Sequence, residues 1–324
     1  MTIYIGCDLR GTNSKAGLVD LEKGAVLLSR SIPTLAHEGQ TNVVERMTDL
    51  IRSLVQEGKD LKHDVQGIGV SAPGPLDLDK GEIVFLTNFP GQWKDFPLRK
   101  TLNTALNLPV SILNDVRAIT YGEFCFGAGK GLDRMACLAI GTGVGGGLII
   151  DKELVLGFSG TAGELGHMTI NPDGPRCGCG NYGCLETYTS GPAISSLASK
   201  IVRQGISTQI AEMVGFDLNK ITPEIVAQAA LDGDEIACEI WDTVGESLGI
   251  GTANICVALG PQRVVLSGGV AAAGDLLLNP IKRTLRERVH VMPGDQVQVV
   301  VSTLGNDVGI LGMASWAGSS PPQI

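Results

Sequence analysis

The chain has 324 residues, of which 44 % are hydrophobic and 18 % are charged, and its formal net charge is −9. This balance excludes a disordered chain, and the negative charge without a Lys/Arg run excludes an obvious nucleic-acid-binding surface. A length of 324 residues exceeds the size at which one core usually stops growing, so we expect two domains. The 44 glycines indicate many tight turns, some of them close to a ligand.

No segment indicates export or a membrane. The chain reaches Asp8 before a signal-type apolar stretch can develop. The longest uncharged apolar run, 135–150, is shorter than the ~20 residues that a spanning helix needs. Five of the eight cysteines are scattered and three crowd together, which is typical of a reducing compartment with a metal site. We therefore expect a cytoplasmic protein without membrane or nucleic-acid partners.

The first part of the chain predicts an antiparallel meander followed by alternating helices and strands. The expected strands of the meander are 2–7, 15–19 and 25–28, with a polar, glycine-bearing turn after the first. Apolar residues at helical spacing predict a helix over 41–57. Two more strands are expected at 67–70 and 109–113, the first before a Pro/Gly loop and the second before a helix that starts near Asn114.

The second part repeats this opening. A strand over 135–140, a glycine-rich turn over 141–147 and a return strand over 148–150 again lead into helices and strands. The later elements are a helix at 247–259, strands at 263–266 and 296–302, and a final helix at 308–316. Such a duplication predicts an α/β fold with two similar halves facing each other across a cleft.

The second glycine turn contains Gly141, Thr142 and Gly143, within a formal G-x-G-x-x-G match. A dinucleotide fingerprint requires a helix directly after the turn, whereas a β-branched strand follows here. The alternatives that remain are an ordinary glycine hairpin and a nest of backbone N–H groups that binds an anion.

The first turn contains Asp8, Gly11 and Thr12. A carboxylate at a strand end beside bare backbone suits Mg²⁺, which proteins usually hold through water and nucleotide phosphates. Such a D-x-x-G pattern is also common in plain turns, but its pairing with a second glycine turn favours a phosphate site.

Asn114 and Asp115 follow a predicted strand at its carboxyl end, where α/β sheets bind ligands. One interpretation is a helix N-cap. The other is a hydroxyl-binding amide beside a general base, which in phosphoryl transfer accepts the proton of the attacking hydroxyl.

One histidine and three cysteines form the most specific motif of the chain. His167, Cys177, Cys179 and Cys184 are separated by ten, two and five residues and supply a tetrahedral Cys₃His ligand set. Four protein ligands leave no open position, so we expect a structural zinc ion. Free thiols and a nucleic-acid-binding zinc ribbon are the alternatives. Glu164 and Glu186 flank the ligands, so the metal would fix their carboxylates for binding a polyol.

The stretch from Gly163 through Glu186, with its G-E-L-G-H and C-G-C-G-N-Y-G-C-L-E segments, resembles the ROK family of sugar kinases and repressors, part of the actin-like ATPase superfamily. The resemblance covers essentially the whole chain. It implies two actin-like (ribonuclease H-like) α/β domains around a central cleft. From it we expect a small domain of residues 1–116 plus 303–324 and a large domain of residues 117–302 that carries the zinc segment.

The resemblance also implies a role for each matching residue. Asp115 would be the catalytic base of an ATP-dependent hexose kinase. The sugar would be bound by Gly74, Asn88, Asn114, Asp115, Glu164, His167 and Glu186. Phosphates and Mg²⁺ would be bound by Asp8, Gly11, Thr12, Gly141, Thr142 and Gly143, and adenosine by Gly268 and Gly269.

Two positions depart from the family pattern. The first turn usually reads D-x-G-G-T, and here Arg10 stands where its first glycine belongs. The stretch 87–93, which contains Asn88, also differs from the usual N-L-P-G-W.

The expected reaction is the phosphorylation of glucose to glucose 6-phosphate, with ATP, Mg²⁺ and a structural Zn²⁺. Fructose, mannose, allose and N-acetylated hexosamines are alternative substrates, and polyphosphate is an alternative donor. The other branch of the family, the sugar-sensing repressors, carries a helix-turn-helix before the first turn, and only seven residues precede Asp8 here. This favours a kinase, which the resemblance implies to be a homodimer or homotetramer.

Overall fold

The computed structural model describes residues 1–86, 89, 93–293 and 296–319. These residues form two compact units. Unit 1 comprises Met1–Gly131, Glu153–Ala162 and the residues from Thr303 on, and unit 2 comprises Leu132–Lys152 and Gly163–Ser302. The expected domain limit at residues 116 and 117 differs from this division. It would cut α3 (Asp115–Phe126), which instead packs against α10 (Val308–Ser319) and belongs to unit 1.

The main sheet of unit 1 contains the predicted meander. Its strand order is β3-β2-β1-β4-β8, with β1 antiparallel to β2 and parallel to β4, and with β4 parallel to β8. The strands are β1 (Ile3–Leu9), β2 (Asn13–Asp20), β3 (Ala25–Pro33), β4 (Val65–Ala72) and β8 (Val110–Asn114). The carboxyl ends of β1, β4 and β8 therefore lie at one edge of the sheet.

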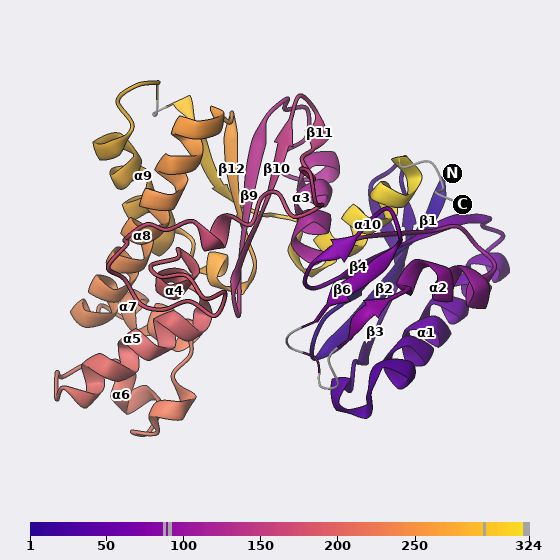
Figure 1. Ribbon diagram of the computed structural model, residues 1–324. Helices are drawn as coiled ribbons and strands as arrows, with labels where there is room; N and C mark the ends of the chain where they lie inside the picture. Colours follow the sequence, from indigo (N-terminus) through magenta and orange to yellow (C-terminus); the bar gives the residue numbers. More distant parts are fainter. Residues whose placement is uncertain (87–88, 90–92, 294–295, 320–324) are drawn as a thin grey trace. The chain divides into compact units, whose positions relative to one another are not determined.

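Helices cover both faces of this sheet (Figure 1). Ile3, Ile5, Cys7 and Leu9 alternate along β1 and share a core with α1 (Gln40–Asp60), which buries its apolar residues at the predicted helical spacing. On the other face, Gly6 lets α10 approach the strand: a Cβ at this position would lie 1.9 Å from the Ile310 carbonyl oxygen.

A second, smaller sheet and a helix complete unit 1. The sheet has the order β5-β6-β7, and its strands are two to four residues long, too short to be predicted. Trp93 is buried beside it, with its ring centroid 5.3 Å from that of Phe89 and 5.6 Å from that of Phe96. The elements are β5 (Leu76–Asp77), β6 (Glu82–Phe85), β7 (Lys94–Phe96), α2 (Leu98–Leu106), η1 (Ala36–Glu38) and η6 (Gly305–Asp307).

A second five-stranded sheet repeats the topology of the first, as the duplication predicts. Its order is β11-β10-β9-β12-β13, with β9 antiparallel to β10 and parallel to β12, and with β12 parallel to β13. Its strands within unit 2 are β9 (Met135–Ile140), β10 (Val144–Ile150), β12 (Arg263–Ser267) and β13 (Gln298–Val301), whereas the edge strand β11 (Glu153–Leu154) belongs to the segment Glu153–Ala162, which is assigned to unit 1. The glycine turn is shorter than predicted, because Gly145, Gly146 and Gly147 pair with β9 inside β10.

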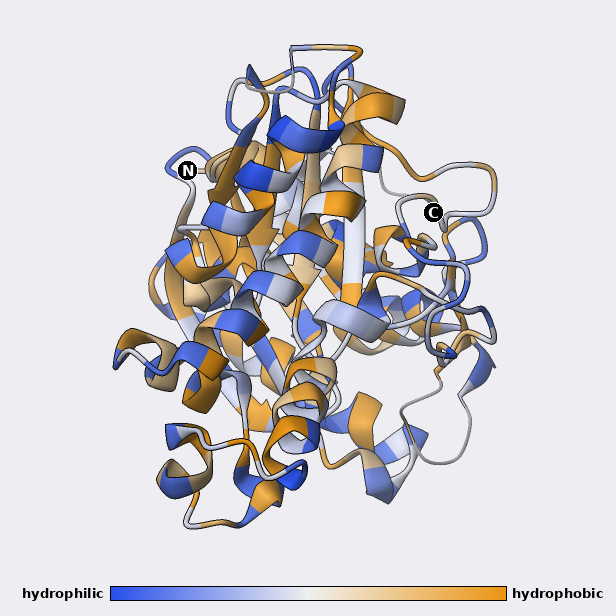
Figure 2. Cartoon of the chain, turned by 90° about the vertical axis from the view of Figure 1, so that its left-hand side faces the viewer, coloured by the Kyte–Doolittle hydropathy of each residue, from blue (hydrophilic) through white to orange (hydrophobic). Residues whose placement is uncertain are grey.

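The remaining elements of unit 2 are mostly helices. They are η2 (Leu165–His167), α4 (Glu186–Thr189), α5 (Gly191–Arg203), α6 (Gln209–Met213), η3 (Leu218–Lys220), α7 (Pro223–Leu231), α8 (Glu235–Leu259), η4 (Gly269–Ala273) and α9 (Asp275–Arg288). The helices facing the viewer in Figure 2 alternate hydrophilic and hydrophobic residues. In α9, Leu277, Ile281 and Leu285 are buried and mark its inner side. No helix among the described residues is both long and apolar enough to cross a bilayer.

Candidate functional site

The turn between β1 and β2, which we call the first turn (residues 8–12), carries a buried carboxylate. Asp8 is 3 % exposed, and its two oxygens accept separate hydrogen bonds, Oδ1 from Ser71 Oγ at 2.7 Å and Oδ2 from Arg10 Nε at 2.6 Å. Each oxygen keeps a further lone pair, so a water of a hydrated Mg²⁺ could also donate to this carboxylate. The residues present therefore fit a water-mediated Mg²⁺ site.

The backbone of the first turn is held in place by Thr34, at the end of β3. Its Oγ1 donates to the Arg10 carbonyl at 2.7 Å, and its N–H donates to the Thr12 carbonyl at 2.8 Å. In the described part of the chain, the N–H groups of Gly11 and Thr12 donate to no protein acceptor. The turn therefore offers two backbone donors in a fixed conformation. Sequence analysis missed Thr34, because only the β2–β3 pairing brings it to the turn.

Asn114 is the N-cap of α3, which confirms the structural interpretation of this residue. Its Oδ1 accepts hydrogen bonds from the N–H groups of Val116 (3.0 Å) and Arg117 (3.3 Å), and its Nδ2 donates to the Gly74 carbonyl at 3.2 Å. Gly74 has a φ of +79°, and a Cβ there would lie 2.7 Å from the Phe85 carbonyl oxygen. A glycine is thus required at the position whose carbonyl orients Asn114.

Asp115 follows directly as the first residue of α3, and its Oδ1 accepts the N–H of Val116 at 2.9 Å. The carboxylate lies at the carboxyl end of β8 and at the N-terminal, positive end of the α3 dipole. Buried Arg117, which sequence analysis did not single out, donates from Nε (3.1 Å) and Nη2 (2.7 Å) to the Ala162 carbonyl. Asn88, another expected sugar ligand, lies outside the described residues.

The second turn (residues 141–143) joins β9 and β10 in unit 2. Within the described residues, the N–H groups of Thr142 and Gly143 have no protein acceptor, so they are available to an anion. The next N–H, of Val144, donates to Glu186 Oε2 at 2.8 Å, and a Cβ on Gly143 would lie 2.5 Å from the same oxygen. The structure thus places Glu186, an expected sugar ligand, against the expected phosphate turn.

Two further segments meet the second turn. Gly191, the first residue of α5, donates its N–H to the Gly141 carbonyl at 2.8 Å, so the positive end of this helix adjoins the turn. Gly268 has a φ of +88°, and a Cβ there would lie 2.4 Å from the Ile140 carbonyl oxygen. Sequence analysis predicted Gly268 and Gly269 but missed the start of α5, although Ser190-Gly191-Pro192 is a typical helix start.

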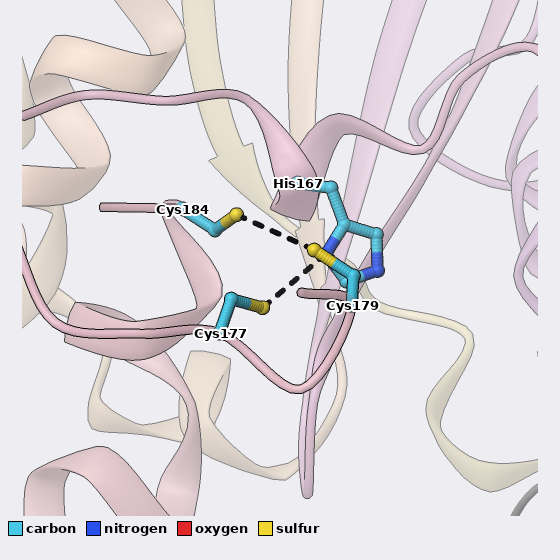
Figure 3. A group of neighbouring side chains, drawn as sticks. All are labelled: His167, Cys177, Cys179 and Cys184. Atoms are coloured by element: carbon cyan, nitrogen blue, oxygen red, sulfur yellow. Dashed lines mark hydrogen bonds between the residues drawn. The ribbon is translucent and has the colours of Figure 1, made fainter. Parts of the chain in front are cut away.

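His167, Cys177, Cys179 and Cys184 point toward one another, as Figure 3 shows, and their ligand atoms all lie within 4.8 Å of one another. His167 Nδ1 is 3.7 Å from Cys177 Sγ, and Cys179 Sγ is 3.7 Å from Cys184 Sγ. A tetrahedron of thiolates with Zn–S bonds of ~2.3 Å has edges of about 3.8 Å. The cluster could therefore hold a tetrahedral metal ion with little movement.

The environments of the three thiols differ. Burial, reinforced by the Cys177 and Cys179 thiols, raises the pKa of Cys184 to about 12, and burial also raises the pKa of Cys177. At Cys179 a hydrogen bond from the backbone of Asn181 lowers the pKa. Since a metal binds thiolates, ion binding would release protons from the two buried cysteines.

The two flanking carboxylates are placed differently. Glu164 is exposed and immediately precedes η2, which carries His167. Glu186 is partly buried at the start of α4, and its Oε1 accepts a long contact of 3.8 Å from Cys177 Sγ. Glu186 therefore connects the cysteine cluster to the second turn, a connection that no local sequence pattern predicts.

Comparisons with known proteins agree with this architecture. The model of the ROK family matches residues 4–320. A glucokinase of Halalkalibacterium halodurans is 35 % identical over 311 residues, which cover 95 % of this chain and 93 % of that protein. The solved structure of a ROK family glucokinase from Streptomyces griseus, in complex with glucose and AMPPNP, is 30 % identical, covers 98 % of this chain and 100 % of that chain, and has a TM-score of 0.84.

A regulator has the same fold. The structure of a ROK family transcriptional regulator, a homolog of the E. coli MLC protein, is 27 % identical, has a TM-score of 0.86, and covers 98 % of this chain and 78 % of that chain. The expected actin-like α/β fold is thus confirmed, and it is common to kinases and regulators. On the family match and the glucokinase identity together, the chain belongs to the ROK family.

Proposed function

We propose that the protein is an ATP-dependent hexose kinase that converts glucose to glucose 6-phosphate. The observation that carries this proposal is Asp115, a carboxylate at the carboxyl end of β8, beside an asparagine held by three hydrogen bonds. A regulator that only binds a sugar has no need of a positioned base. The identity of 35 % to a glucokinase over nearly the whole of both chains supports the same conclusion.

In this proposal Asp115 acts as the general base. Its carboxylate accepts the proton of the sugar 6-hydroxyl while the hydroxyl oxygen bonds to the γ-phosphorus of ATP, and the bond from that phosphorus to the β,γ-bridging oxygen breaks to release ADP. Phosphoryl transfer depends mainly on positioning and charge stabilisation, and a general base contributes roughly 10²–10⁴-fold. Asn114 would bind a neighbouring hydroxyl through the N–H of Nδ2 that Gly74 leaves unused.

The nucleotide phosphates would be bound by the two turns, and adenosine would lie against Gly268 and Gly269. The second turn supports this role with two N–H groups that have no acceptor among the described residues and with the adjoining start of α5. The first turn adds the N–H groups of Gly11 and Thr12 and the buried Asp8 carboxylate. Mg²⁺, held through water by Asp8, would supply positive charge to the phosphates.

The sugar would be bound in unit 2 by Glu164, His167 and Glu186. With His167 Nδ1 on a zinc ion, its Nε2 keeps a proton that can be donated to a sugar hydroxyl. The zinc ion would be structural, because His167 and the three cysteines complete its shell. We also propose that these residues and Asp115 act on one sugar molecule, and that Asn88 is a further sugar ligand. The proposed enzyme is cytoplasmic and oligomeric.

A sugar-sensing regulator is the second candidate, because a regulator structure matches this fold with a TM-score of 0.86. A coupled ADP-release assay separates the candidates. Purified protein is incubated with ATP, or with polyphosphate, and with each of a panel of hexoses and N-acetylhexosamines. We expect ADP release that depends on a hexose and is fastest with glucose. Sugar binding by calorimetry without ADP release from any panel member would contradict the kinase.

A further inference from the structure

Arg10 gives the first turn a charged side chain where the family pattern has a glycine. Its Nε donates to Asp8 Oδ2 at 2.6 Å, while Ser71 occupies the other oxygen of the same buried carboxylate. The Arg10 backbone is held as well, since its carbonyl accepts the hydroxyl of Thr34. Both ends of this residue are therefore fixed by buried partners.

The outer part of the guanidinium is not used by the protein. Within the described residues, Nη1 and Nη2 of Arg10 have no acceptor, and the side chain is 48 % exposed. Four N–H donors of a permanently charged group are thus left for a ligand, beside the unpaired N–H groups of Gly11 and Thr12. The next basic residue along the chain, Lys15, is already paired with Asp307 at 2.6 Å.

We propose that Arg10 binds the terminal phosphate of the nucleotide, with Asp8 as the anchor that orients it. This inference rests on the proposed function. A guanidinium that donates from Nε to a carboxylate can still present its two Nη groups to phosphate oxygens, and such charge-assisted pairs are the strong ones among hydrogen bonds. The first turn would then bind phosphate through a side chain as well as through backbone N–H groups.

The opposite role for Arg10 is a blocking one, in which it neutralises Asp8 and competes with Mg²⁺ for the carboxylate. The two roles predict opposite outcomes for Arg10→Gly, which restores the family pattern, and for Arg10→Gln. If Arg10 binds phosphate, both variants lose a phosphate ligand, and nucleotide binding weakens. If Arg10 instead blocks the carboxylate, both variants remove the blocking side chain, and nucleotide binding with Mg²⁺ strengthens.

The test is calorimetric binding of AMP, ADP and AMPPNP to the full-length protein, with Mg²⁺ and with EDTA. For Arg10→Gln we expect the Kd of AMPPNP to rise about 10- to 100-fold, that of ADP less, and that of AMP not at all. Arg10→Lys should give an intermediate Kd for AMPPNP, because lysine keeps the positive charge but lacks the paired Nη donors of arginine. Arg30→Gln is the matched control, because Arg30 of β3 is also a half-exposed arginine that is paired with a carboxylate, that of Glu57 in α1.

Each outcome decides the matter. In Arg10→Gln, an equal rise of Kd for all three nucleotides, or a Kd for AMPPNP that stays the same or falls, would overturn the proposed role of Arg10. Neither result would contradict the proposed kinase. Wild-type protein that binds none of the nucleotides would overturn this inference together with the proposed kinase. Glucose binding and the melting temperature of each variant, unchanged from wild type, establish that the variants are folded.

Discussion

The two turns occupy equivalent positions in two sheets of the same topology, yet they differ in chemistry. The first turn follows β1 and carries a buried Asp8 paired with Arg10. The second turn follows β9 and contains two glycines, and directly after it the N–H of Val144 donates to Glu186, forty-two residues along the chain. The repeated strand order fixes where each turn lies, whereas its side chains decide what it can bind.

This difference suggests that the two turns would contribute differently to phosphate binding, the second through backbone N–H groups and the first also through charged side chains. In the proposed function, bare backbone and the start of α5 would let phosphates approach the second turn closely. The first turn supplies charge, positive from Arg10 and negative from Asp8. Glu186 connects the second turn to the cysteine cluster, and among the residues that the structure describes no such cluster lies in the unit of the first turn.

The largest expected effect comes from removing the metal. Cys179→Ser should lose close to one zinc per chain and abolish glucose binding, because Glu164, His167 and Glu186 lose their fixed positions. Nucleotide binding should weaken only through the contact of Glu186 with the second turn. Metal analysis and titrations of glucose and AMPPNP measure these effects. The control is Cys238→Ser, which removes an exposed cysteine of α8. Glucose binding that survives in metal-free Cys179→Ser would contradict the account.

A methyl group tests the approach of phosphates to each turn. Among the described residues, a Cβ on Gly141 or on Gly11 would meet no atom within 4 Å beyond the chain neighbours, and neither glycine has a positive φ. Alanine should therefore leave the fold intact and exclude only a ligand. We expect Gly141→Ala to raise the KM for ATP about tenfold with the KM for glucose unchanged, and Gly11→Ala to raise it less, because Arg10 adds a contact there. Equal KM values for wild type and Gly141→Ala would show that no phosphate lies against this turn.

Gly143→Val is expected to change the binding of both ATP and glucose, and not of ATP alone. The valine Cβ would collide with Glu186 Oε2, so Gly143→Val should weaken the binding of both ATP and glucose. The contrast with Gly141→Ala measures how strongly the second turn and the sugar ligands depend on each other.

The smallest effect is expected for Thr34, whose hydrogen bonds hold the backbone of the first turn. Thr34→Val keeps the shape of a side chain that is 2 % exposed and removes its hydroxyl, so the Arg10 carbonyl loses its hydrogen bond. We expect a loss of about 1 kcal/mol in the free energy of unfolding, measured with urea, and a slightly weaker affinity for AMPPNP. An unchanged free energy of unfolding would mean that water replaces the hydroxyl without cost.

Local patterns predicted much of the fold and of the site. The two turns and the Asn114–Asp115 pair each lie within a few residues, and the cysteine motif lies within one short segment from His167 to Cys184, so their spacing can be recognised in the sequence. The contacts of Thr34 with Arg10, Arg117 with Ala162 and Glu186 with Val144 join distant segments and depend on strand pairing and packing. The start of α8 at Glu235 was also missed, because polar residues such as Glu239 and Asp242 obscure the apolar periodicity.

The base is the centre of the account, and Asp115→Asn tests it most directly. This change keeps the size of the side chain and its acceptor for the Val116 N–H, and it removes the ability to take up a proton. With glucose and ATP both saturating, kcat should fall by roughly 10²–10⁴-fold while calorimetry gives a nearly unchanged Kd for glucose. A kcat within a few-fold of wild type would contradict the assignment of Asp115 as the base.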